Sequence, residues 1–231
     1  MNPGNVNVVL AHGAWADGSS WSKVIDQLSA QGIRAIAAPL PLTSLADDVA
    51  ALEQTLERID GPVVLAGHAY AGAVIGAARS DAIEALVFIA ALAPDEGETV
   101  GDVFYRGEQH SQAPKLAPDR HGRIWLAEPD FAAAFAQDAT PQELAVLAAV
   151  QRPISVACIG EAVGRPGWRD TPSWYLIAEQ DRMIDPNTQH FMADRMNAHL
   201  HSHQVDHTPL VTAPQIVTNV IVDAVHAISA R

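Results

Sequence analysis

Short apolar runs rich in β-branched residues alternate with amphipathic helical segments along most of this chain. Each run is bounded by glycine, proline or small polar residues, which is typical of a buried strand. The runs expected to form strands are residues 7–11, 33–38, 62–66, 85–90, 173–178 and 199–205. Helical patterns follow them over residues 20–32, 44–59, 70–79, 185–196 and 213–229. This alternation predicts an α/β fold, in which helices cover both faces of a mostly parallel sheet.

The alternation stops after the fourth predicted strand. Residues 95–167 contain glycines, prolines, charges and short helical pieces, with no strong strand. Thr140 and Glu143 form a capping-box pattern there, and Pro153 is expected to open a further helix through Cys158. We therefore predict a core of residues 1–94 and 168–231 and a small helical cap over 95–167. Because open α/β sheets bind ligands at their carboxyl edge, we expect this insertion to form a lid over a site.

Composition narrows the classes of protein that the chain can belong to. Hydrophobic residues make up 48% of its 231 residues and charged residues 18%, so a large core is expected and disorder is not. The formal net charge of -13, with no cluster of Lys or Arg, argues against nucleic acid as a partner. Cys158 is the single cysteine, so no intrachain disulfide can form, and its apolar neighbours indicate a buried packing residue.

The sequence also carries no pattern of targeting or membrane insertion. Its first residues lack the basic region and the long apolar stretch of a signal peptide. The longest apolar runs, such as residues 85–93, are far shorter than the ~20 residues of a membrane span. We therefore expect a soluble cytoplasmic protein with no membrane partner, either a monomer or a homodimer.

The turn after the third predicted strand has the pattern of a nucleophile elbow that lacks its nucleophile. Such an elbow reads G-x-S-x-G between a strand and a helix, and small residues must flank its strained central residue. Here Gly67 and Ala71 hold the small positions and Gly72 adds room, but the central residue is Ala69. Taken alone, this stretch also fits an ordinary turn between a strand and a helix. Other residues of the chain are needed to distinguish such a turn from an elbow.

An acid and a base follow later strands in the order that an elbow enzyme needs. Asp181 comes after the strand predicted at 173–178, and His207 comes after the last predicted strand. Positions 69, 181 and 207 therefore match the order nucleophile, acid, base. The imidazole would take the proton of the nucleophile, and the carboxylate would fix the tautomer of the imidazole. Three other acids lie close to them in sequence: Glu179, Asp206 and Asp185, the last of which is better placed as a helix N-cap.

Two loops offer groups for binding a substrate. The loop after the first strand and the turn after Ala69 can each present a backbone N–H, and we assign Ala14 and Tyr70 as the two oxyanion donors. The side chains expected to line a substrate pocket are His68, Trp15, Phe104, Tyr105, Trp125 and Met183. His199, His201 and His203 alternate on one predicted strand, but no carboxylate is fixed beside them, so no metal site is predicted.

Five stretches together resemble a known family: "VVLAHGAWADGSSW", "VVLAGHAYAGAVI", "LVFIAALAPDEGET", "SWYLIAEQDRMI" and "VDHTPLVTAPQ". They are similar to the small α/β-hydrolases of esterase type, akin to plant methyl esterases and hydroxynitrile lyases. The resemblance implies a Ser-His-Asp hydrolase that acts on esters, sometimes on amides or lactones, without a cofactor. It maps the base to His207, the acid to Asp181 and the oxyanion donors to Ala14 and Tyr70. It also implies a serine where this chain has Ala69.

Three explanations of Ala69 remain open at this point. Alanine is the smallest change that deletes a serine hydroxyl, so the chain is interpreted first as a carboxylic ester hydrolase captured as an inactive nucleophile-to-alanine variant. The parent would then work through an acyl-enzyme intermediate on a small ester-like substrate. Alternatively, the chain is a natural lyase or proton-transfer catalyst that needs only His207 and the oxyanion donors. The third explanation is a protein that binds a small molecule without catalysis.

Overall fold

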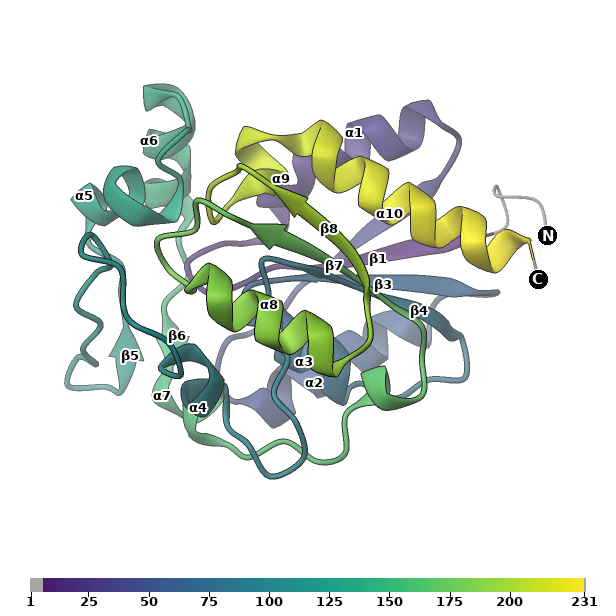
Figure 1. Ribbon diagram of the computed structural model, residues 1–231, viewed down its shortest axis with the longest axis horizontal. Helices are drawn as coiled ribbons and strands as arrows, with labels where there is room; N and C mark the ends of the chain where they lie inside the picture. The colour runs from purple at the N-terminus through teal and green to yellow at the C-terminus, as the bar shows by residue number, and fades with distance from the viewer. Residues whose placement is uncertain (1–5, 231) are drawn as a thin grey trace.

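The computed structural model describes residues 6–230, and its centre is a six-stranded sheet (Figure 1). The strand order is β2-β1-β3-β4-β7-β8, and every neighbouring pair is parallel. β1, β3 and β7 are buried along their whole length, as expected where helices cover both faces of a parallel sheet. The predicted fold class is therefore confirmed, with strands β1 Asn7–Ala11, β2 Arg34–Ala38, β3 Val63–His68, β4 Ile83–Ile89, β7 Ser173–Ala178 and β8 His199–His203.

The helices of the core form one layer on each face of the sheet. Figure 1 shows α1 and α10 together on one side, and α2, α3 and α8 on the other. Their bounds are α1 Ser22–Ala30, α2 Leu45–Leu56, α3 Ala71–Ala77, α8 Pro186–Arg195 and α10 Pro214–Ser229, with the short η2 Gly18–Trp21 and α9 Pro209–Thr212 beside them. Ser44 and Asp185 cap the starts of α2 and α8 with their side-chain oxygens. Across residues 6–230, no helix combines the length and the apolar character that a bilayer crossing requires.

The insertion between β4 and β7 gathers at the edge of the sheet where the strands end (Figure 1). It contains α4 Val100–Phe104, β5 Arg123–Ile124, α5 Glu128–Asp130, the π-helix η3 Phe131–Phe135, α6 Pro141–Val150, β6 Ile154–Ser155 and α7 Val156–Gly160, with η4 Gly167–Arg169 at its end. The capping box of Thr140 and Glu143 is present at the start of α6. The helix expected to open at Pro153 is wrong in its start: β6 pairs with β5, and α7 begins only after Ser155, which caps it. The boundaries 95–167 of a cap stay a prediction.

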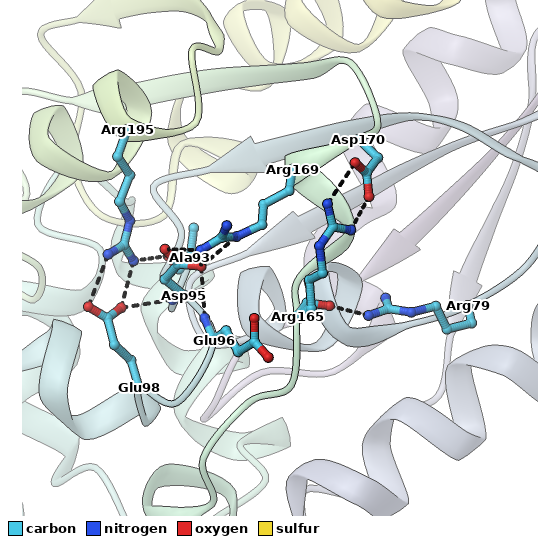
Figure 2. A network of polar contacts seen from close by, with 9 residues as sticks. All are labelled: Arg79, Ala93, Asp95, Glu96, Glu98, Arg165, Arg169, Asp170 and Arg195. Carbon is cyan, nitrogen blue, oxygen red and sulfur yellow. Dashed lines mark hydrogen bonds and ion pairs between the residues drawn. The ribbon is translucent and has the colours of Figure 1, made fainter.

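Arginine–carboxylate pairs hold the two ends of this insertion against the core (Figure 2). Asp95 near its start pairs with Arg169 near its end, at 2.7 Å. Glu98 pairs with Arg195 of α8, at 2.8 Å. These pairs are partly exposed, so each is expected to contribute at most about 1 kcal/mol to stability. Their main effect is to fix where the insertion leaves and rejoins the sheet.

Candidate active site

The turn between β3 and α3 has the backbone shape that a nucleophile elbow requires. Ala69 has a φ of 50°, in the left-handed region that costs a residue with a Cβ about 1–2 kcal/mol. Two hydrogen bonds fasten the turn to the end of β4: Ala69 N–H donates to the Ile89 carbonyl at 3.2 Å, and Leu92 N–H donates to the Ala69 carbonyl at 2.9 Å. The turn is therefore strained and anchored, although the side chain at its tip is only a methyl group.

Three glycines explain why the chain can pack so closely here. A Cβ on Gly67 would lie 2.8 Å from the Ala71 carbonyl oxygen, and one on Gly72 would lie 2.4 Å from the Leu92 carbonyl oxygen. A Cβ on Gly13 would lie 3.0 Å from the Cβ of Ala69. The first two positions accept only glycine, and the third shows that the loop after β1 lies directly against the Ala69 side chain.

Two backbone N–H groups beside this turn are unused. Within residues 6–230, neither the N–H of Ala14 nor that of Tyr70 has a hydrogen-bond partner, and both residues line the same pocket as Ala69. The next N–H in the first loop, that of Trp15, donates to the Arg152 carbonyl at 3.1 Å. Unpartnered N–H groups on residues that line a buried pocket are what an oxyanion hole requires. Their catalytic role stays a prediction.

The predicted acid and base meet in the structure. His207 follows β8 and Asp181 follows β7, and His207 Nδ1 lies 2.8 Å from Asp181 Oδ2. Both side chains are almost completely buried. The imidazole donates its Nδ1 proton to the carboxylate, which leaves Nε2 with a lone pair to accept a proton. His207 and Ala69 line one pocket, so a base at Nε2 beside the elbow stays the prediction.

Asp181 is held by donors on both of its oxygens. Its Oδ1 accepts hydrogen bonds from the N–H groups of Met183 at 2.7 Å and Ile184 at 2.9 Å. Its Oδ2 accepts a further bond from Gln189 Nε2 at 2.8 Å. Gln189 in turn donates to the Ile184 carbonyl at 3.0 Å and accepts from Ala178 N–H at 3.0 Å. Sequence reasoning missed Gln189; its signal is a polar residue in the first turns of the helix that follows the acid.

The three other acids near these loops have partners elsewhere. Asp206 is buried, which raises its pKa, and it accepts hydrogen bonds from backbone groups of the insertion and of its own loop. Glu179 pairs with His190 at 2.9 Å. Asp185 caps α8, as expected. Asp181 is thus the carboxylate that contacts His207.

His68 was expected in the pocket wall, and the structure corrects this. It lies behind His207: its Nε2 donates to the His207 carbonyl at 2.7 Å, and the two ring centroids are 4.9 Å apart. Burial lowers the pKa of His68 to about 3, so this histidine is neutral at ordinary pH. His68 supports the loop that carries His207 and does not line the pocket.

Phe135 of the π-helix supports the same imidazole from the insertion. Its ring centroid lies 5.4 Å from that of His207 and 6.2 Å from that of Trp15. The Phe135 carbonyl also accepts a hydrogen bond from the Thr208 hydroxyl, next to His207 in the chain. The insertion therefore contacts His207 as well as covering the pocket, a role that the sequence did not indicate.

The pocket beside Ala69 is lined mainly by apolar side chains. Four of the predicted wall residues line it: Trp15, Phe104, Tyr105 and Met183. The wall also includes residues that were not predicted, namely Leu92, Val100, Leu116, Ile154, Ile159 and Ile184. Trp125 was also predicted in the wall, and this is wrong: its side chain is 52% exposed, and its Nε1 donates to Asp119 at 3.3 Å. Its neighbours Ile124 and Leu126 are buried, and Trp125 between them faces outward.

In the part of the chain that the structure describes, no three His, Cys, Asp or Glu side chains are grouped so as to hold a metal ion. The histidines of β8 have other surroundings. His199 stacks on Trp174 with ring centroids 4.7 Å apart, and His201 lies 3.5 Å from Asp223.

Comparisons with known proteins agree with this fold. Residues 8–219 match the Alpha/beta hydrolase family. Methylesterase 3 of Arabidopsis thaliana is 24% identical to this chain, and the match covers 90% of this chain and 92% of that protein. A pyrethroid hydrolase from Sphingobium faniae JZ-2 superimposes with a TM-score of 0.80 at 20% identity, covering 98% of this chain and 100% of that chain. A mutant of tomato Methylketone Synthase I superimposes with a TM-score of 0.82 at 16% identity, covering 96% and 98%.

Proposed function

The chain belongs to the alpha/beta hydrolase family, in its esterase-like part, and from this premise we propose that it is the nucleophile-to-alanine form of a carboxylic ester hydrolase. The observation that carries the proposal is Ala69 itself. It keeps a φ of 50° and close glycine contacts, which a turn without a nucleophile does not need. Around it lie the buried pair of His207 and Asp181 and two free N–H groups.

With a serine at position 69, these groups perform acyl transfer. His207 Nε2 takes the hydroxyl proton while the oxygen attacks the ester carbonyl carbon. The N–H groups of Ala14 and Tyr70 stabilise the negative charge that develops on the carbonyl oxygen. The imidazolium then protonates the departing alcohol, and an acyl-enzyme remains, which water hydrolyses with His207 again acting as base. With Ala69 the first bond cannot form, so the chain binds its ester and scarcely turns it over.

The test is the gain of an oxygen at position 69. Ala69→Ser should raise kcat for a short p-nitrophenyl ester by up to about 10⁶, the factor associated with a triad nucleophile. Release of p-nitrophenol measures it. Ala69→Gly is the matched control, since it changes the same turn without adding a hydroxyl, and it should bring no gain. A folded Ala69→Ser protein that is no faster than the unaltered chain contradicts the proposal, and so does a gain that survives His207→Ala.

If alanine is the native residue at position 69, a second function is favoured. His207 and the two free N–H groups suffice to move a proton next to a carbonyl or to cleave a lyase substrate, since neither step needs a nucleophile at position 69. A pocket that only binds a small apolar molecule, without catalysis, needs no proton transfer at all. Turnover by the unaltered chain, lost in His207→Gln, would support the lyase or proton-transfer function; saturable binding without turnover in either protein would support the binding function.

A further inference from the structure

The pocket wall offers a ligand very few polar groups. Four of its lining residues carry an N–H or O–H in the side chain: Trp15, Tyr70, Tyr105 and His207. None of the lining residues, within the described chain, is Lys, Arg, Asp or Glu. What a bound molecule can reach therefore depends on where these four polar atoms point.

Two of the four are committed to partners outside the pocket. Trp15 Nε1 donates to the Ile124 carbonyl at 3.0 Å. The Tyr70 hydroxyl donates to Asp48 Oδ2 at 2.6 Å. Tyr105 is 58% exposed, which places it at the mouth. Among the described side chains of the inner wall, His207 thus offers the one uncommitted polar atom, Nε2, and the N–H groups of Ala14 and Tyr70 lie beside it, which is enough for one carbonyl group.

Asp48 is a buried carboxyl directly behind this wall. Its side chain is inaccessible to solvent, and it forms no ion pair with any cation in residues 6–230. Leu42 N–H donates to its Oδ1 at 2.6 Å, while the Tyr70 hydroxyl and the Cys158 thiol donate to its Oδ2, the thiol at 3.7 Å. Three donors and no acceptor are what a carboxylate requires. Burial opposes ionisation of Asp48, because it raises the pKa of this carboxyl group.

A negative charge at Asp48 would act on the pocket through low-dielectric surroundings. Tyr70 both donates to Asp48 and lines the pocket, so one side chain separates the carboxylate from the ligand. Repulsion between like charges is much stronger there than in water, and no cation of the wall offsets it. This repulsion weakens the binding of any ligand that carries a carboxylate of its own.

We infer that this pocket is selective for charge: it takes uncharged esters of apolar acids and rejects the carboxylate product, and Asp48 behind Tyr70 sets this preference. The inference rests on the proposed function and names its substrate class. Hydrolysis of such an ester converts a neutral ligand into an anion, so the product is driven out of the site as its proton leaves. The polar end of a larger ester lies toward Tyr105 at the mouth.

The test uses three probes of one shape: methyl phenylacetate, phenylacetamide and phenylacetate. Calorimetry with the unaltered chain at pH 7.5 should show the carboxylate binding at least about tenfold more weakly than the ester and the amide. Asp48→Asn keeps the shape of the side chain and removes its charge, and it should reduce this ratio several-fold by strengthening carboxylate binding. Cys158→Ala is the matched control, because it removes a donor to Asp48 without changing charge, and the ratio should persist.

Each outcome bears on a separate claim. Carboxylate binding as tight as ester binding in the unaltered chain overturns the charge selectivity, even if Ala69→Ser hydrolyses esters and the proposed function stands. A ratio unchanged in folded Asp48→Asn overturns the role of Asp48. If Asp48→Asn does not fold, the ratio in the unaltered chain still decides the selectivity. Binding of none of the three probes overturns the selectivity, and an inactive Ala69→Ser protein would then overturn the function as well.

Discussion

The site has two sides: the acid–base side, which is Asp181 and His207, and the elbow side, which is the turn at Ala69 with the loop after β1. The backbone and the hydrogen bonds are ordered on both sides, but only the acid–base side carries reactive side-chain atoms. After β7 and β8, every oxygen of Asp181 has a donor and His207 is fixed by that carboxylate. After β1 and β3, the glycine contacts, the strained φ and the free N–H groups are present, while Ala69 ends in a methyl group. The difference teaches that backbone packing creates the elbow, so its central side chain can change without disturbing the other half.

Among the changes that compare these two sides, the largest effect is expected from a substitution on the acid–base side that leaves the elbow intact. In the Ala69→Ser protein, Asp181→Asn should lower kcat for the p-nitrophenyl ester by about 10⁴, because an amide no longer fixes the tautomer of His207. Steady-state kinetics on the double variant measures this. Asp206→Asn is the matched control, since Asp206 is also buried beside His207 but contacts other groups. A loss from Asp206→Asn equal to that from Asp181→Asn would contradict the assignment of Asp181.

A smaller effect concerns His68, which ends β3 on the elbow side but donates to the His207 carbonyl on the acid–base side. Burial lowers its pKa to about 3 in the folded chain, against about 6.5 when unfolded. Below pH 6.5 the unfolded chain gains a proton that the folded chain does not, so stability is lost as the pH falls from there toward 3. Between pH 8 and pH 5 this loss should be about 2 kcal/mol.

Urea unfolding at the two pH values measures that loss. His68→Gln removes the titrating group and keeps an amide donor toward the His207 carbonyl, so its free energy of unfolding should fall less between pH 8 and pH 5 than that of the unaltered chain. Equal losses of unfolding free energy in the two proteins would contradict this, because His68 would then not be the buried neutral group whose protonation costs stability.

The strands, the elbow and the pairing of His207 with Asp181 could be predicted because each has a local pattern. A polar residue directly after an apolar strand lies at the carboxyl edge of a parallel sheet, whatever the rest of the chain does. His68 and Trp125 were misplaced for the opposite reason. A histidine at a strand end and an aromatic residue in an irregular insertion do not show in sequence which way they point.

The residues that were missed act through contacts between distant segments. Gln189 reaches Asp181 from α8, Phe135 reaches His207 from the insertion, and Asp48 reaches Tyr70 from α2. Each looks ordinary in its own helix. Their positions depend on how the helices pack against the sheet, and no local pattern encodes that packing.

The central claim is that His207, Asp181 and the N–H groups of Ala14 and Tyr70 converge on the side chain of residue 69. Covalent labelling of the Ala69→Ser protein with a p-nitrophenyl phosphonate, followed by intact-mass and peptide mass spectrometry, tests it most directly. We predict one adduct per chain, attached at position 69, absent from the unaltered chain and lost when His207→Ala is added. An unlabelled Ala69→Ser protein, or an adduct at another residue, would contradict the account.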